Sequence, residues 1–160
     1  MPIFLQVAAV AAAIAHANPA VYNGRAGEVT VPLPRVASEA TVDGTTSAAA
    51  WAEAAMLNGF SGYLPVDGVA ADDSTEVLVW YSPTAIYFGI RAFEAHGAPH
   101  AALANRDVID ADDNVRLILR PFRNSRQALV FAVNPFGVQD DGTITEGDVF
   151  RPDTQNHTLS

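Results

Sequence analysis

Residues 75–92 read TEVLVWYSPTAIYFGIRA, and this stretch decides the fold class. The run from Glu76 to Tyr81 is rich in β-branched and aromatic residues and is too short for a globular helix, so it predicts a strand. Ser82-Pro83-Thr84 predicts a tight turn, because proline suits the second position of such a turn. From Ile86 to Phe93, the even-numbered residues are apolar and aliphatic or aromatic, and the odd-numbered residues would lie on the other face of a strand. This stretch therefore predicts a partner strand and, with the turn, a hairpin.

Two more strands are predicted downstream of this hairpin. From Val115 to Arg120 successive side chains are expected to point to opposite faces of a strand. One face would carry Val115, Leu117 and Leu119, and the other Arg116, Ile118 and Arg120. Ala128 to Val133 is nearly continuous in apolar residues, as expected for a strand buried on both faces, and Asn134-Pro135 ends it. Asp141-Gly142 predicts a further hairpin turn.

The signals upstream of the hairpin are weaker. Residues 18–37 predict a linker that contains an edge strand. Ala40 to Gly44 predicts a short strand that closes on an Asp-Gly turn, and the Ala-rich segment from Ser47 to Ala55 predicts a short helix whose Trp51 packs on the sheet. Leu57 to Val69 mixes glycines with aromatics and predicts an irregular loop. The edge strand is expected at Val29, Val31 and Leu33.

Short strands with turn residues between them, and a single short helix, predict an all-β fold. The expected architecture is an antiparallel β-sandwich of the jelly-roll kind, over residues 38–160. Arg151 to Ser160 is polar and adds no strand, so the sandwich is expected to be incomplete at its C-terminal end.

Residues 1–17 predict a signal peptide. Pro2 to Ala15 is apolar except for Gln6, and Ala15-His16-Ala17 before Asn18-Pro19 has the small-x-small pattern of a signal peptidase site. The segment lacks the usual basic residue at its start, and the alternative is a buried Ala-rich helix. The mature chain is expected to begin at Asn18 and to be exported.

Composition and charge exclude several classes of function. Nine basic residues stand against eighteen acidic ones, which gives a net charge of −9, so no nucleic acid partner is expected. The absence of cysteine excludes disulfides, cysteine-ligated metals and a thiol nucleophile. No G-x-S-x-G motif occurs, and a glycoside hydrolase needs two carboxylates across one cleft, which the sequence alone does not supply. The module itself is therefore not expected to be an enzyme.

The candidate binding residues are acidic, aromatic and amide side chains. Asp110, Asp112 and Asp113 offer oxygen ligands for a structural calcium ion, with solvated turn aspartates as the alternative. A neutral sugar stacks on aromatic rings while polar side chains bind its hydroxyls, and each such residue has a purely structural alternative. Trp80 and Tyr87 are the expected stacking residues. Arg91, Asn134 and Gln139 are the expected hydroxyl-binding residues.

Several segments, among them Val42-Asp43-Gly44, Ile86–Ala92 and Phe131–Gly142, match one known family together. They resemble a family 9 carbohydrate-binding module, of the version found at the N-terminus of large bacterial outer-membrane-associated proteins. The most specific of them is VNPFGVQDDG, residues 133–142. The similarity covers Ser38 to Gly147 and implies a β-sandwich that binds sugar chain ends, often with structural calcium. It also implies a place in the periplasm or at the outer membrane or surface of a Gram-negative cell. The other segments are Val42-Asp43-Gly44, Ala50-Trp51, Thr75–Val77, Ile86–Ala92 and Asp113–Leu117.

The resemblance does not extend to the family's sugar site. Asp110, Arg116 and Ala132 stand where that family has a stacking tryptophan, a glutamate and an arginine. The sequence thus predicts a non-catalytic module of an exported envelope protein, with an oligosaccharide or polysaccharide as its partner. One alternative is a periplasmic structural or plug-like domain that contacts the C-terminal membrane-associated part of its own protein through residues 57–69. The other is a part of a glycoside hydrolase.

Overall fold

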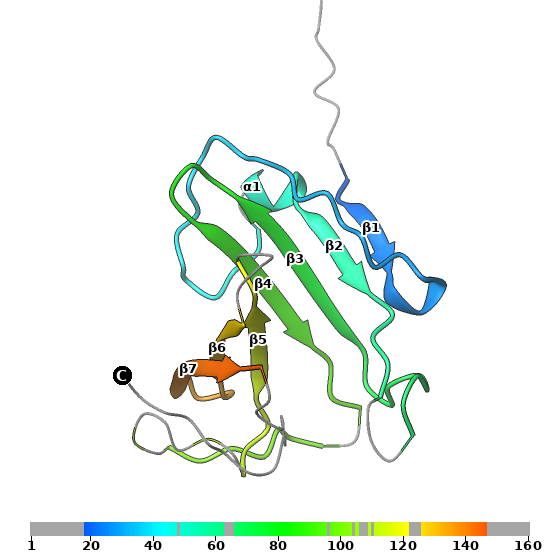
Figure 1. Cartoon of the computed structure of the whole chain (residues 1–160), viewed down its shortest axis with the longest axis vertical. Coiled ribbons are helices and arrows are strands. Elements are labelled where there is room, and N and C mark those ends of the chain that lie inside the picture. Colours follow the sequence, from blue (N-terminus) through cyan, green and yellow to red (C-terminus); the bar gives the residue numbers. More distant parts are fainter. Residues whose placement is uncertain are drawn as a thin grey trace, which may run out of the picture. The chain divides into compact units, whose positions relative to one another are not determined.

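The computed structural model describes residues 18–47, 49–62, 66–95, 97–103, 105, 109, 111–121 and 126–146. In these residues the strands form two sheets with almost no helix, which confirms the predicted all-β class (Figure 1). The chain divides into two compact units, Met1–Ala95 (unit 1) and His96–Ser160 (unit 2). Each unit contains one of the sheets, and their packing into a sandwich stays a prediction.

Unit 1 contains a four-stranded sheet in the order β1-β2-β3-β4 (Figure 1). The predicted hairpin is confirmed, because β3 and β4 pair antiparallel with Trp80 opposite Tyr87. The Ser82 hydroxyl accepts hydrogen bonds from the backbone N–H groups of Thr84 and Ala85, which fixes the turn between them. Strand β2 is antiparallel to β3 and parallel to β1. The strands are β1 (Ala20–Asn23), β2 (Ala55–Asn58), β3 (Thr75–Tyr81) and β4 (Ile86–Ala92).

Upstream of the hairpin the sequence prediction needs correction. The edge strand lies at β1 instead of at residues 29–33, where Val29 is exposed. The first buried residue in the described part of the chain is Val36. Residues 40–44 form a bend without the predicted strand. Helix α1 (Ala49–Ala52) is shorter than predicted because Ala55 already belongs to β2, which the sequence did not reveal. A single 3-10 turn, η1 (Gly24–Ala26), follows β1.

A core cluster of unit 1 lies on the face of its sheet that α1 covers, while Ala55, Val77 and Val79 are buried on the opposite face. Trp51 of α1 meets Trp80 of β3 edge to face, with ring centroids 5.8 Å apart, so the prediction that Trp51 packs on the sheet is confirmed. Fully burying an aromatic or aliphatic side chain contributes about 1.5–3 kcal/mol, so these residues hold the helix on the sheet. The core cluster comprises Val36, Ala50, Trp51, Ala54, Leu78 and Trp80.

Unit 2 contains a three-stranded antiparallel sheet in the order β5-β6-β7. The predicted hairpin turn at Asp141-Gly142 is wrong, because both residues lie inside β7 and pair with β6. The chain instead turns at residues 134–138, where Gly137 adopts the left-handed conformation (φ 79°). The strands are β5 (Val115–Leu119), β6 (Gln127–Val133) and β7 (Gln139–Thr145).

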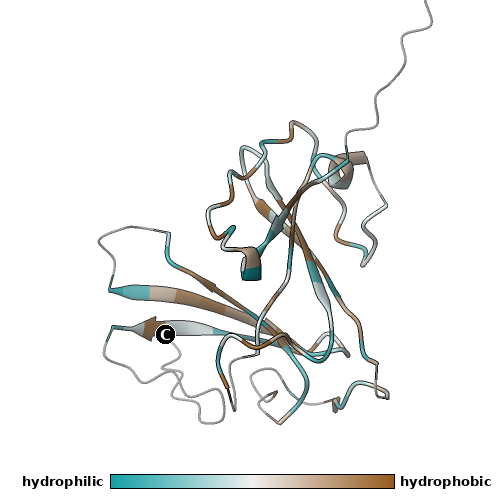
Figure 2. Cartoon of the chain, turned by 90° about the vertical axis from the view of Figure 1, so that its right-hand side faces the viewer, coloured by the Kyte–Doolittle hydropathy of each residue, from teal (hydrophilic) through white to brown (hydrophobic). Residues whose placement is uncertain are grey.

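Strand β6 is buried on one face only, which corrects the prediction of a strand buried on both. Ala128, Val130 and Ala132 are buried, whereas the residue that follows each of them is 40–45% exposed. The apolar run is continuous, but the pleat of a strand divides it between two faces. In Figure 2, strands of both sheets contain hydrophobic stretches, which are coloured brown. The exposed side chains are Leu129, Phe131 and Val133.

Candidate functional site

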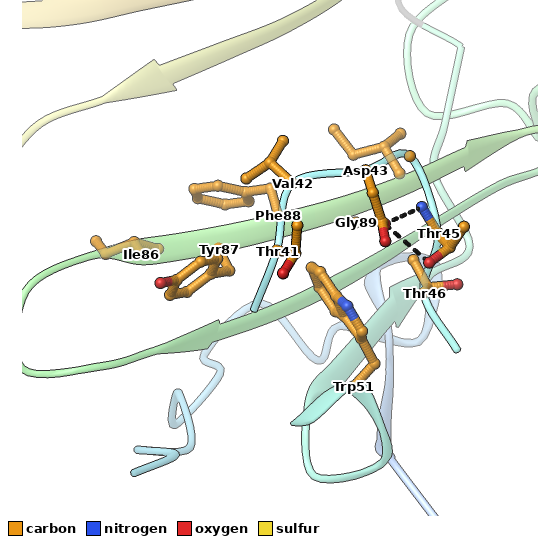
Figure 3. Close-up of a pocket in the computed structure, with 12 residues that line it drawn as sticks. Thr41, Val42, Asp43, Thr45, Thr46, Trp51, Ile86, Tyr87, Phe88 and Gly89 are labelled. Carbon is orange, nitrogen blue, oxygen red and sulfur yellow. Dashed lines mark hydrogen bonds between the residues drawn. The ribbon is translucent and has the colours of Figure 1, made fainter. Parts of the chain in front are cut away.

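Unit 1 contains a pocket of about 240 Å³ between the loop of residues 41–46 and strand β4 (Figure 3). Its walls combine aromatic rings with hydroxyl groups and one carboxylate. The described lining residues are Thr41–Thr46, Trp51 and Ile86–Ile90.

The shape of the loop depends on Asp43. Its Oδ1 accepts hydrogen bonds from the backbone N–H of Thr45 (2.9 Å) and from the Thr45 hydroxyl (2.8 Å), and Gly44 takes a left-handed φ of 79° between them. The backbone bond from Thr45, with its hydroxyl bond second, lowers the pKa of Asp43 below 3.8. The predicted Asp-Gly turn is therefore confirmed, and it carries a stable negative charge into the pocket wall.

Glycine at position 89 lets the loop and the helix approach β4. A Cβ atom there would lie 2.8 Å from Thr46 Cγ2 and 2.9 Å from Trp51 Cζ3, both too close for real contacts. Thr46 and Trp51 therefore pack directly against the backbone of Gly89.

The free edge of β4 contributes backbone groups to the pocket. In an antiparallel pair of strands, residues that lie opposite each other alternate along the strand between pairs joined by backbone hydrogen bonds and pairs that are not. Phe93 N–H donates to Ser74 C=O and Ser82 N–H donates to Ala85 C=O, so the odd-numbered residues of β4 bond to β3. The even-numbered residues Ile86, Phe88 and Ile90 direct their N–H and C=O groups away from β3. No hydrogen bond to these outward groups occurs within the described residues.

Tyr87 lies in the pocket wall, as a sugar-stacking residue should, whereas the assignment of Trp80 is wrong. The Trp80 ring is fully buried, so no ligand reaches it. Its ring stacks on that of Tyr87, with centroids 4.1 Å apart and an interplanar angle of 14°. Tyr87 is half-buried, so Trp80 supports the ring that a ligand can contact.

Arg91 lies beside the pocket without lining it. Its Nη2 donates to the hydroxyl of Thr46, and its Nη1 lies 3.8 Å from Glu76 Oε2. Arg91 thus connects the loop to β4, and its role in binding hydroxyls stays a prediction.

The other two predicted hydroxyl-binding residues lie in unit 2. Asn134 is buried, and its side chain uses all of its hydrogen-bonding groups within the protein, so its assignment as a ligand-binding residue is wrong. Gln139 is exposed at the start of β7, opposite Val133. The predicted site residues therefore do not form one cluster.

The predicted calcium ligands are only partly described. Asp110 lies outside the described residues. Asp112 Oδ2 accepts hydrogen bonds from Asn134 Nδ2 (2.8 Å) and Ala102 N–H (3.2 Å), and these bonds, that of Asn134 first, lower the pKa of Asp112. Asp113 Oδ2 accepts a hydrogen bond from His100 N–H. No group of three potential metal ligands is found in the described part of the chain, and calcium stays a prediction.

The sequence did not reveal that the loop of residues 41–46 faces β4. The Asp-Gly turn was recognisable, but no local pattern shows which strand edge a loop lies against. Comparison with known proteins found no family model, no curated protein and no solved structure that matches the chain. No helix among the described residues is long and apolar enough to cross a membrane.

Proposed function

We propose that the chain is a non-catalytic carbohydrate-binding module of an exported cell-envelope protein, and that it binds sugar in the pocket beside β4. The observation that carries the proposal is the combination of the Tyr87 ring with the outward backbone groups of β4 on the same pocket wall. A sugar ring has apolar C–H faces and a rim of hydroxyls, and this wall offers a partner to each.

The hydrogen-bonding groups of the pocket suit hydroxyls. A hydroxyl both donates and accepts, and the outward N–H and C=O groups of Ile86, Phe88 and Ile90 provide both functions along one edge. Thr41 also lines the pocket, and its hydroxyl lies between Tyr87 and Trp51 (Figure 3). The hydroxyls of Thr45 and Thr46 are bonded to Asp43 and Arg91. The volume of about 240 Å³ is below the roughly 300–1,000 Å³ of pockets for drug-sized ligands. One sugar ring is therefore the expected occupant.

The glycosidase alternative finds no support in this pocket. Glycoside cleavage needs two carboxyl groups about 5–9 Å apart. Among the described lining residues, Asp43 provides one carboxylate and no second is present.

A glycan array probed with the full chain tests the proposal. We expect saturable binding that falls at least about tenfold, or about 1.4 kcal/mol, in Tyr87→Ala and falls measurably in Thr41→Val, which removes a hydroxyl but keeps the shape. Phe136→Ala removes an exposed aromatic ring from unit 2 and is the matched control. Circular dichroism shows whether each variant is folded. Failure of the folded chain to bind any glycan would refute the proposed function, and binding insensitive to both pocket variants would refute the site.

A second candidate function is contact with a membrane-embedded part of the same protein. The loop after β2 is closed by hydrogen bonds from Gly62 N–H to Val69 C=O and from Gly68 N–H to Gly62 C=O. It exposes Phe60, Val66 and Val69, and exposed apolar side chains gathered in one loop favour such a contact. A photo-crosslinker at Val66 should react with a membrane-embedded chain in cells, whereas one at the more exposed Val42 should not. Equal reaction at both positions would argue against this function.

A further inference from the structure

We propose that the pocket beside β4 prefers sugars that carry a free, protonated amino group. The inference rests on the proposed function and names the class of sugar that the same site takes.

The charge of the pocket favours a cationic ligand. Among the described lining residues, Asp43 alone carries a charge. Both hydrogen bonds from Thr45 use its Oδ1, which leaves Oδ2 for a ligand. An ammonium group forms its strongest hydrogen bonds with such a carboxylate oxygen.

The neighbouring arginine does not cancel this charge. Arg91 bonds to Thr46, but its guanidinium is paired with Glu76 on β3 and does not line the pocket. Asp43, Arg91 and Glu76 together carry one net negative charge. Uronic acids should therefore be disfavoured, and amino sugars favoured over neutral ones.

The aromatic wall favours the same class of ligand. The Tyr87 ring is stacked on Trp80 on one side and lines the pocket, with Trp51 nearby in the wall. The face of an aromatic ring is electron-rich and attracts a cation as well as apolar C–H groups. An amino sugar can stack on the ring and place its ammonium group on the Asp43 carboxylate. A neutral sugar can offer that carboxylate only an uncharged hydroxyl, which makes a weaker bond, and an acidic sugar is repelled by it.

Isothermal titration calorimetry on the full chain tests the proposal with three disaccharides: glucosamine disaccharide, its fully N-acetylated form and digalacturonate. At about pH 6 the free amines are protonated and the uronates are charged. We expect the glucosamine disaccharide to bind about fivefold more tightly than the N-acetylated form, and digalacturonate to bind most weakly. The preference should shrink at high salt, because screening weakens exposed charge pairs.

Asp43→Asn removes the negative charge but keeps the shape of the loop, since the asparagine Oδ1 can still accept the hydrogen bonds from Thr45. This variant should bind the free and the N-acetylated disaccharides about equally. Asp67→Asn removes the same charge from an exposed position outside the pocket, and it should keep the preference.

The outcomes distinguish the two proposals. If the N-acetylated disaccharide binds as tightly as the free amine, and Tyr87→Ala abolishes both, the amino preference is wrong while the proposed function stands. If Asp67→Asn abolishes the preference as Asp43→Asn does, the preference reflects the overall charge of the chain and the inference is again wrong. If no glycan binds, both proposals fail.

Discussion

Asn134 holds two segments of unit 2 together through its side chain. Its Nδ2 donates to Ala102 C=O (3.0 Å) and to Asp112 Oδ2 (2.8 Å). Its Oδ1 accepts from the N–H groups of Phe136 (3.0 Å) and Val138 (2.9 Å), which shapes the turn before β7. An amide with this set of bonds has no group left for a ligand.

Asn134→Ala should therefore destabilise the chain without changing glycan binding. A buried donor that loses its partner costs about 1–3 kcal/mol, so we expect a loss of about 2 kcal/mol in urea unfolding. Leu103→Ala, at a side chain 82% exposed in the neighbouring loop, is the control and should change stability by less than about 0.5 kcal/mol. An unchanged unfolding midpoint in Asn134→Ala would contradict this role.

Asp43 should titrate below the ordinary range of an aspartate. Its lowered pKa comes first from the backbone N–H of Thr45 and second from the Thr45 hydroxyl. A depressed folded pKa means that the stability from this charge is present above the unfolded value of 3.8 and is lost as the pH falls through the folded value. Carbon-13 NMR titration should give a midpoint under 3.8. In Thr45→Ala the midpoint should rise only part of the way, because the stronger backbone donor remains.

For Trp80, the sequence predicts the face of the strand but not whether that face is buried. The alternation in residues 76–81 places Trp80 on the face opposite Val77 and Val79, and the structure agrees. Whether that face meets water depends on α1, which is distant in the sequence and covers it through Trp51. The proposed stacking role therefore falls to Tyr87, its cross-strand partner. The sequence predicts both residues as candidates and does not distinguish them.

Strand β4 depends on a side-chain-free position at its centre. Gly89→Ala should destabilise unit 1 by about 1–3 kcal/mol, because the new methyl group would overpack against Trp51 and Thr46. Gly62→Ala is the control, since its Cβ would meet nothing nearer than Val69 O at 3.8 Å. Thermal unfolding should separate the two variants, and equal midpoints would show that the loop yields to the methyl group.

The two edges of β4 should differ in amide hydrogen exchange. Gly89 and Arg91 bond to β3 and should exchange slowly, whereas Phe88 and Ile90 face the pocket and should exchange quickly. Addition of a bound sugar should slow the exchange of Phe88 or Ile90. Uniform protection along β4 in the free chain would contradict the assignment of its edge.

Among the elements, those with a strong local signal were predictable. The hairpin of β3 and β4 combines strand-forming residues with a proline turn, and β5 alternates clearly. Strands β1 and β2 have four residues each and pair in parallel across more than thirty positions of the sequence, so no local pattern marks them. Asp141-Gly142 has the chemistry of a turn, yet the hydrogen bonds of Asn134 place the turn earlier.

The acidic balance of the chain governs its long-range interactions. A net charge of −9 repels polyanions, so the chain should pass through a heparin column at low salt and bind an anion-exchange resin. Retention on heparin that weakens with salt would point to a basic surface that the composition does not suggest. For the molecule as a whole, composition and turn pattern were sufficient to predict the all-β class. They were insufficient for the pocket, because its two walls come from residues forty or more positions apart.

The pair of tryptophans has a spectroscopic consequence. Trp51 and Trp80 are the two tryptophans of the chain, and both are buried in unit 1 with their rings 5.8 Å apart. Intrinsic tryptophan fluorescence therefore reports on unit 1 alone, while the backbone circular dichroism signal averages over both units. Since Trp51 also lines the pocket, its emission should change if the proposed sugar binds there. The protein thus carries its own optical probe at the pocket where we propose that sugar binds.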